Sequence, residues 1–263
     1  MTRSSPPPDA PRACATGKIR LYVREALGPG AHFTLPRDQS HYAARVMRAG
    51  PGDPVLLFNG KDGEWRAVIA STDKRSVTVR VETRLREQDT VPDLTLLFAP
   101  VKRARLDFLA QKATELGVRA LRPVFTRRTI VKRINLERME ANAGEAAEQC
   151  GRLTVPEVLE PVKLTRLLEA WPAGHRLLFC DEALPESAPA RRAREVLSGL
   201  GGAERTAPWS VLIGPEGGFA PEERDLLHAL RGSIAVSLGP RIMRADTAAI
   251  AALALWQAHL GDW

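Results

Sequence analysis

From residue 93 onward the sequence alternates between continuous apolar runs and helix-forming segments, and this rhythm restricts the fold more than any other feature. Continuous apolar runs are typical of strands that are buried on both faces of a parallel sheet, with helices filling the gaps. The candidate strands are Leu94–Val101, Leu121–Phe125, Arg176–Cys180, Ser210–Gly214 and Ile234–Gly239. We therefore predict an α/β domain over residues 91–263.

Two helices of this domain are predicted from composition. Arg103–Leu116 places Leu106, Leu109, Ala110 and Ala113 on one face and ends at Gly117, a suitable C-terminal cap. Ala248–Trp256 is apolar but only about half as long as a membrane span, so we predict a buried helix. Residues 183–208 combine prolines, charges and paired glycines, which indicates a loop or a short exposed helix.

The preceding residues, 18–90, have a different pattern. Ile19, Leu21 and Val23 alternate with other residues, the period-two pattern of half-buried strands, and Val77, Val79 and Val81 repeat it. Asn59-Gly60 and Asp62-Gly63 favour hairpin turns between two further strands. One helix is expected at His41–Arg48, before Gly50-Pro51-Gly52. These residues predict a small, barrel-like β domain.

The first 17 residues are polar and rich in proline, so we predict a disordered tail over 1–17. This tail lacks the pattern of a secretory signal, which favours a cytoplasmic protein. The chain has 3 widely separated cysteines and 5 histidines with no metal-ligand spacing, so we expect no disulfide framework and no metal. Residues 99–133 hold 10 basic and 2 acidic side chains. This excess of positive charge favours binding of a polyanion, but it is also typical of a basic face that is only exposed to solvent.

Two glycine-containing loops follow the last two predicted strands. The first, Gly214–Phe219, could bind a phosphate as glycine turns at helix starts do. However, Glu216, Glu222 and Glu223 would repel a phosphate, and no Gly-Lys-Ser/Thr follows. S-adenosylmethionine, which has a positive sulfonium and no phosphate, is a better candidate. A tight turn that needs glycine only for its geometry is the alternative.

The second loop, Leu238–Ala248, leads into the apolar final helix. Asp246 or Thr247 could cap that helix, and for Asp246 this capping role is favoured over a functional one. Arg241 and Arg244 beside a glycine turn could instead neutralise a phosphate or stabilise a developing anion.

Together these two loops resemble the paired signature of the RsmE family, the 16S rRNA uracil-N3 methyltransferases. Three further segments resemble landmarks of that family in the same order: His41 to Asp53, Lys112–Val118 and Glu148–Arg152. The resemblance spans roughly residues 19–260. Where the family usually reads Leu-Arg-Thr-Glu-Thr-Ala, this chain has Met243-Arg244-Ala245-Asp246-Thr247-Ala248. Methionine conserves the volume and apolar character of leucine, whereas Asp246 is one methylene shorter than glutamate.

The resemblance implies a fold, a cofactor and partners. The fold is a PUA-like β-barrel RNA-binding domain followed by a SPOUT methyltransferase domain, whose final strand and helix form a trefoil knot. The cofactor is S-adenosylmethionine, and the partners are the 16S rRNA of the small ribosomal subunit and a second copy of the chain in a homodimer. The implied reaction is methylation of uridine at N3.

Site residues are expected on both loops and on basic segments. For catalysis we predict Arg244 as the group that stabilises the uracil anion, with Glu216 as a candidate general base. The predicted cofactor-binding residues are Leu212, Ile213, Gly214, Pro215, Gly217, Gly218, Leu238, Gly239, Ile242, Met243 and Thr247. The predicted RNA-binding residues are Arg45, Arg48, Lys102, Arg105, Arg127, Arg128 and Arg152.

Two other functions remain open from the sequence. One is a non-catalytic rRNA-binding or ribosome-assembly protein with a vestigial cofactor site. The other is a SPOUT methyltransferase that modifies transfer RNA or a ribose hydroxyl.

Overall fold

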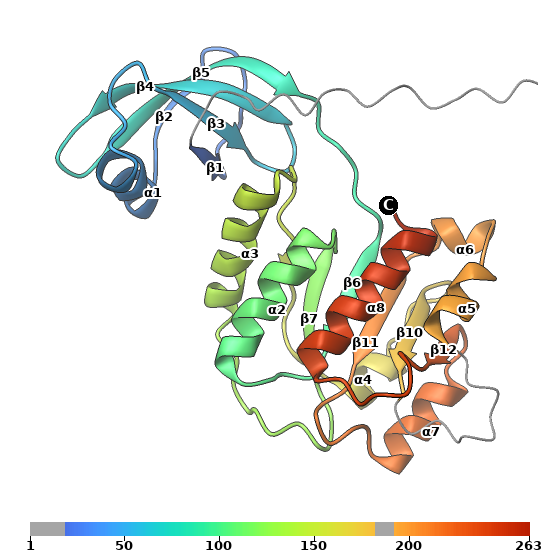
Figure 1. Cartoon of the computed structure of the whole chain (residues 1–263). Coiled ribbons are helices and arrows are strands. Elements are labelled where there is room, and N and C mark those ends of the chain that lie inside the picture. The colour runs from blue at the N-terminus through green and yellow to red at the C-terminus, as the bar shows by residue number, and fades with distance from the viewer. Residues whose placement is uncertain (1–18, 182–191) are drawn as a thin grey trace, which may run out of the picture. The chain divides into compact units, whose positions relative to one another are not determined.

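The computed structural model describes residues 19–181 and 192–263. The predicted tail at 1–17 and residues 183–191 of the predicted loop lie outside these ranges. The chain divides into two compact units, residues 1–89 and residues 90–263 (Figure 1). Among the helices of the described ranges, none is both long enough and apolar enough for a membrane crossing.

The N-terminal unit is a curled five-stranded sheet with the order β1-β3-β4-β5-β2, which confirms the predicted β-rich unit (Figure 1). Strands β3, β4 and β5 are consecutive and antiparallel, whereas β1 pairs in parallel with β3. The strand bounds are β1 Arg20–Tyr22, β2 His32–Thr34, β3 Pro54–Phe58, β4 Glu64–Thr72 and β5 Val77–Arg86. The alternating residues of β5, Val77, Val79 and Val81, are fully buried, as the period-two pattern predicts.

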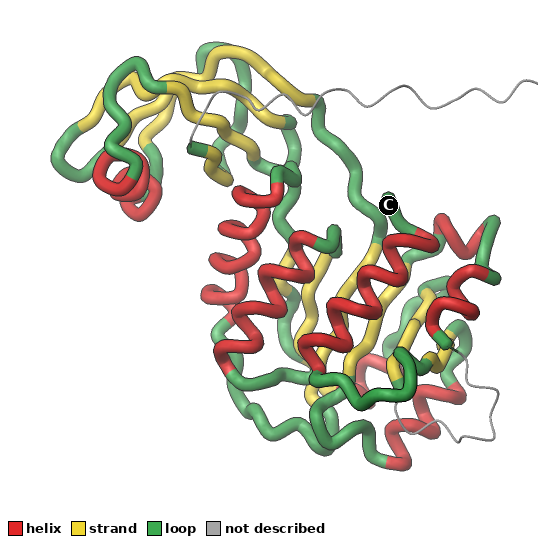
Figure 2. The backbone as a smooth tube through the Cα atoms, viewed as in Figure 1, coloured by secondary structure: helices red, strands yellow, loops and turns green. Residues whose placement is uncertain are grey.

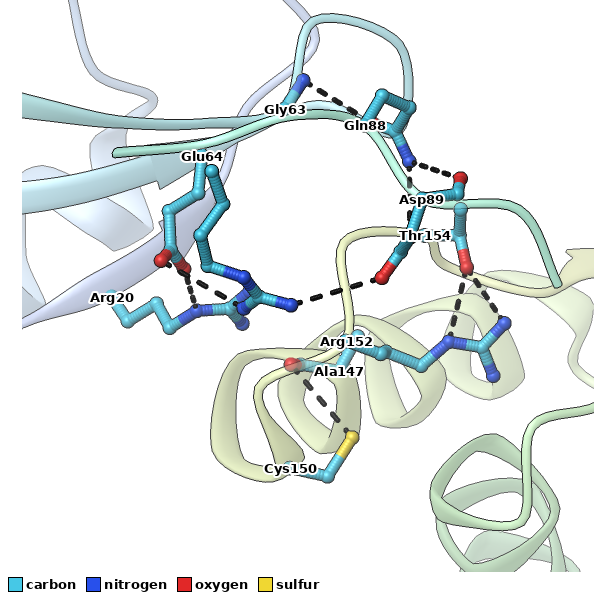
Figure 3. Close-up of polar contacts among 10 residues, drawn as sticks. Arg20, Gly63, Glu64, Gln88, Asp89, Ala147, Cys150, Arg152 and Thr154 are labelled. Carbon is cyan, nitrogen blue, oxygen red and sulfur yellow. Dashed lines mark hydrogen bonds and ion pairs between the residues drawn. The ribbon is translucent and has the colours of Figure 1, made fainter. Parts of the chain in front are cut away.

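The helical segment of this unit begins earlier than predicted. Helix α1 covers Arg37–His41 and continues as a π-helical turn over Tyr42–Val46. Arg48 follows with a φ of 55°, a left-handed conformation that is uncommon for a residue with a side chain. On the sheet, a partly buried ion pair joins Arg20 Nε to Glu64 Oε1 at 2.7 Å (Figure 3).

The C-terminal unit contains a seven-stranded parallel sheet with the order β12-β10-β11-β6-β7-β8, in which β9 also pairs with β7. The bounds are β6 Leu94–Phe98, β7 Ala120–Phe125, β8 Glu157–Val158, β9 Val162–Lys163, β10 Arg176–Cys180, β11 Trp209–Ile213 and β12 Ser233–Val236. All five predicted strands are confirmed. The sequence did not reveal β8 and β9, because two residues are too few to form a pattern.

Helices cover both faces of this sheet (Figure 1). One face carries α2, α3, α5 and α8, and the other carries α4 and α7. Their bounds are α2 Arg103–Glu115, α3 Leu136–Cys150, α4 Leu164–Glu169, α5 Ala193–Ser198, α6 Ala203–Thr206, α7 Pro221–Ala229 and α8 Ala245–Leu260. Helix α8 buries Trp256 against the core, which confirms the predicted buried helix.

Residues 192–208 differ in part from the prediction of a loop or a short exposed helix, because α6 is short and has no buried residue whereas α5 packs into the core. They form α5 and α6, and α5 buries Ala193 and Leu197 in the core. Two apolar residues four positions apart lie on one face of a helix, which is sufficient to dock it.

The parallel arrangement brings distant loops to one edge of the sheet. The segments that follow β6, β7, β11 and β12 all leave the carboxyl edge and gather there (Figure 2). Ligands of open α/β sheets bind at this edge. The knot depends on the whole chain path, including residues 182–191 outside the described ranges, so it stays a prediction.

Candidate active site at the carboxyl edge of the sheet

A cavity of about 650 Å³ lies at the carboxyl edge, between the loop after β11 and the loop after β12. Its lining contains Glu216 and Arg244. It also contains nine of the predicted cofactor-binding residues: Ile213, Gly214, Pro215, Gly217, Gly218, Leu238, Gly239, Ile242 and Met243. The two loops, which are separated by 18 residues in the sequence (220–237), therefore form one concave site.

Leu212 and Thr247 are the predicted cofactor-binding residues that do not line the cavity. Leu212 is fully buried in the core formed with α4 and α7, because neighbouring residues of a strand point to opposite faces. Thr247 lies exposed on the first turn of α8. For these two side chains the structure gives no support to the predicted contact.

The loop after β11 is compact because two of its glycines meet specific requirements. A Cβ atom on Gly214 would lie 3.0 Å from the buried ring of Phe219. Gly218 has a φ of 68°, and its N–H donates to the Pro215 carbonyl over 2.8 Å. Larger residues at either position would strain or open the turn.

Acidic side chains of this region bind to the protein itself. The buried carboxylate of Glu223 accepts hydrogen bonds from the Ala220 N–H at 3.1 Å and from the Arg127 N–H at 2.8 Å. Glu222 Oε2 lies 2.9 Å from Arg127 Nη1. A backbone N–H at the start of α7, together with Arg127, lowers the pKa of Glu222. These two carboxylates therefore organise the start of α7.

Arg105 of α2 lies between the two loops. Its Nη1 is 3.8 Å from Glu216 Oε1, and its Nε is 4.0 Å from Asp246 Oδ2. The prediction that Asp246 caps α8 is wrong, because the N-cap position is Arg244 and Asp246 is the second helical residue. Its carboxylate still lies in the first turn, where negative charge is favourable.

The loop after β12 contributes two arginines to the cavity lining. Arg241 and Arg244 are exposed, and Ile242 is 88% exposed at the rim of the cavity. Within residues 19–181 and 192–263, neither arginine side chain has a hydrogen bond or ion pair to the protein. Both guanidinium groups are available for an anionic ligand.

The end of β10 completes the cavity, and sequence reasoning missed it. Burial raises the pKa of the Cys180 thiol to about 12, so this thiol stays protonated and is not a nucleophile. The buried Asp181 carboxylate binds Arg224 at 3.0 Å and His228 at 3.2 Å. Because parallel strands end at the same edge, the position of these residues after a predicted strand was the available signal.

Other missed lining residues had no sequence signal. Arg192 of the segment before α5 and Arg224 of α7 reach the cavity only through the packing of their helices. Among the described residues, no group of three or more His, Cys, Asp or Glu side chains is arranged to hold a metal ion.

The predicted RNA-binding residues fall into three groups. Arg45, Arg48 and Lys102 are exposed. Arg105, Arg127 and Arg128 are held by other residues of the C-terminal unit, Arg128 by a 2.7 Å hydrogen bond to the Gly217 carbonyl.

Arg152 forms the third group, because its guanidinium is committed to the fold. It donates to the carbonyls of Thr114 at 2.7 Å and Val118 at 3.0 Å, and it also binds the Thr154 hydroxyl (Figure 3). These bonds cap the carboxyl end of α2. The structure therefore favours a structural role for Arg152 over the predicted RNA contact.

Comparisons with known proteins agree with this arrangement. The RNA methyltransferase domain family matches residues 87–257, and the RNA methyltransferase PUA domain family matches residues 35–82. Ribosomal RNA small subunit methyltransferase E of Rickettsia conorii is 33% identical over 236 residues, which cover 89% of this chain and 93% of that protein.

Solved structures are similar over the same extent. A putative methyltransferase from Legionella pneumophila, solved with the bound cofactor SAM, is 31% identical with a TM-score of 0.79, covering 93% of this chain and 99% of that one. Ribosomal RNA small subunit methyltransferase E from Neisseria gonorrhoeae, bound to S-adenosyl methionine, is 29% identical with a TM-score of 0.81 and the same coverage. Because the family model spans well over half of the chain and the Rickettsia relative is similar across most of it, this chain belongs to the ribosomal RNA small subunit methyltransferase E family of RNA methyltransferases.

Proposed function

We propose that this RNA methyltransferase transfers a methyl group from S-adenosylmethionine to N3 of a uridine in 16S rRNA. The observation that carries the proposal is the cavity that both signature loops form together, at the edge where open α/β sheets bind ligands. The S-adenosylmethionine bound in the Legionella and Neisseria structures supports the choice of donor.

The cavity fits a donor that has an apolar base and no phosphate. Ile213, Leu238, Met243 and Ala248 supply apolar lining that suits an adenine ring. Glu216, exposed in the first loop, would disfavour a phosphate and tolerate the positive sulfonium. When bound, the donor supplies an electrophilic methyl group.

The protein itself has to bind the target uracil in an unpaired state and to stabilise the negative charge that forms on it. Uridine N3 lies on the Watson–Crick edge and carries a proton, so the base must be unpaired and deprotonated before it can react. The negative charge then spreads onto the uracil oxygens. Arg244 lines the cavity and is exposed, so it is our candidate for stabilising that anion.

Glu216 is the candidate base, and Arg105 is a positioning residue for it. The Arg105 guanidinium lies near the carboxylates of both Glu216 and Asp246, so it links the two loops electrostatically. A shorter acid at position 246 still lies within 4.0 Å of Arg105. The departure from the family glutamate is therefore compatible with an ordered site.

Phosphate contacts are proposed on both units. Arg45 and Arg48 of the N-terminal unit and Lys102 of the C-terminal unit are exposed and suited to a polyanion. We further propose that the enzyme acts as a homodimer in the cytoplasm, with its final strand and helix knotted. The exposure of Ile242 at the cavity rim supports a covering partner.

The test is to incubate the chain with labelled S-adenosylmethionine and small ribosomal subunits that lack the modification, and then to identify the product nucleoside. We expect 3-methyluridine. A ribose-methylated product, or methyl transfer only to transfer RNA, would show that the enzyme modifies a different position or a different RNA. Binding to the subunit without any transfer would indicate an assembly protein.

A further inference from the structure

The segment after β7 has an unusual composition. Residues 126–133, here called the basic loop, read Thr-Arg-Arg-Thr-Ile-Val-Lys-Arg and contain four basic residues and no acidic one. Ile130, in the middle of these charges, is 84% exposed. A single exposed isoleucine is ordinary on a protein surface, but one in a segment with four basic residues and no acidic one suits a ligand that is both anionic and aromatic.

The first half of the basic loop is fastened to the loop after β11. Arg128 donates to the Gly217 carbonyl at 2.7 Å, and Arg127 binds Glu222 through its side chain and Glu223 through its N–H. At the base of the loop, the Thr126 N–H donates to the Thr129 hydroxyl at 2.9 Å. Arg127 and Arg128 thus have protein partners that hold this half beside the cavity.

The second half is different. Lys132 and Arg133 are exposed, and their side chains make no hydrogen bond or ion pair within the described part of the chain. Val131 and Ile134, the flanking apolar residues, are partly buried. The chain therefore orients two cations and Ile130 outward from an anchored base.

The segment that follows β6 adds further positive charge at the same edge of the sheet as the basic loop. Strands β6 and β7 are parallel neighbours, so the segments that follow them leave the same edge of the sheet as the cavity (Figure 2). Lys102 and Arg103, which follow β6, are also exposed. A strand of nucleic acid that enters the cavity would meet positive charge along this edge.

We propose that Ile130, Lys132 and Arg133 form a docking tip for the single-stranded RNA that flanks the target nucleotide, while Arg127 and Arg128 anchor this tip to the loop after β11. The proposal rests on the proposed rRNA methyltransferase function. Lys132 and Arg133 contact phosphates, and Ile130 packs against the face of an unstacked base. Arg127 and Arg128, predicted from the sequence as RNA contacts, are thereby reassigned as positioning residues.

The experiment measures the affinity of the full chain for a uridine-containing single-stranded RNA oligonucleotide by fluorescence anisotropy at several salt concentrations. The variant Lys132→Ala/Arg133→Ala should bind about tenfold more weakly. The slope of log affinity against log salt should become shallower by about 1.4, as expected for two lost single-strand phosphate contacts. Ile130→Ser should weaken binding and leave that slope unchanged, because it removes no charge.

A matched control removes two cations from the opposite edge of the same sheet. Arg205 and Arg231 are exposed and lie shortly before β11 and β12, at their amino ends. Arg205→Ala/Arg231→Ala should retain the wild-type affinity and salt slope. Calorimetric affinity for S-adenosylmethionine should be unchanged in both double variants, which shows that each is folded.

Three results would overturn the proposal. The first is wild-type RNA affinity in Lys132→Ala/Arg133→Ala, and the second is an equal loss in the control variant. The third is dissociation of an oligomer by Ile130→Ser, seen in sedimentation, which would make Ile130 a contact between copies of the chain. If the wild type binds RNA through the tip but transfers no methyl group, the proposed function fails and the docking tip stands.

Discussion

The two loops that line the cavity use their charged residues in different ways. The region after β11 directs its charges at the protein: Glu223 binds two backbone N–H groups, and the Gly217 carbonyl accepts from Arg128. Arg241 and Arg244 of the loop after β12 line the cavity, are exposed, and have no protein partner for their side chains in the described part of the chain. One loop is built to be rigid, and the other presents its charge to a ligand.

This difference explains why both loops are needed. A catalytic site is effective when its donors are held in place before the reaction, so that little reorganisation is needed as charge develops. The loop after β11 forms a rigid side of the cavity, and the loop after β12 supplies Arg241 and Arg244, which no acidic side chain of the described residues neutralises. We therefore expect substitution of Glu223 in the first region to reduce stability and substitution of Arg244 in the second to reduce catalysis.

The largest effect is expected for Arg244→Ala. Removing a donor that stabilises a developing anion should slow methyl transfer by about 10²–10³-fold, while S-adenosylmethionine affinity, measured by calorimetry, stays near the wild-type value. Arg231→Ala, at the amino end of β12, is the control and should retain activity. Equal losses of cofactor affinity and of rate would contradict a role confined to catalysis.

The second-largest effect, on stability, is expected for Glu223→Ala, which leaves the Ala220 and Arg127 N–H groups without their acceptor. Loss of these bonds should lower the free energy of unfolding by about 1–3 kcal/mol, as measured by urea denaturation. Asp225→Ala, an exposed site on the same helix, should change it little. If Glu223→Ala were as stable as the wild type, the contrast between the loops would be lost.

A smaller effect is expected for Arg105→Ala, since the two carboxylates that it links are partly exposed. Ion pairs of this kind contribute less than about 1 kcal/mol, so the dissociation constant for S-adenosylmethionine should rise about two- to fivefold. Arg103→Ala on the same helix should leave it unchanged. A wild-type constant in Arg105→Ala would show that the loops are not linked through this side chain.

The smallest effect is expected for Glu222→Gln, and it should depend on pH. Interactions with a backbone N–H and with Arg127 lower the pKa of Glu222 below its ordinary 4.5. Its contribution to stability is therefore present above about pH 4.5 and is lost as the pH falls through the folded-state pKa. The difference in Tm between wild type and variant should shrink across that window, and a difference that grows in acid would refute the assignment.

Much of the C-terminal sheet could be predicted from the sequence, because strands that are buried on both faces of a parallel sheet consist of continuous apolar residues. Leu94–Phe98 and Arg176–Cys180 illustrate this, as each lies within a predicted run. Nine of the predicted cofactor residues line the cavity because they are adjacent in two short motifs. Leu212 belongs to the same motif but points into the opposite layer, since strand residues alternate between faces.

The sequence by itself determined the five longer strands of the C-terminal unit, the helix after the first of them and the two signature loops, since periodicity and motifs are local properties of the chain. Only the tertiary structure decided which charges are free. The sequence predicts Arg127, Arg128 and Arg152 as surface cations, but the side chain of each has partners that lie far from it in the chain. The partners of a charged side chain are the groups that pack against it, and that packing is set by the fold rather than by neighbouring residues.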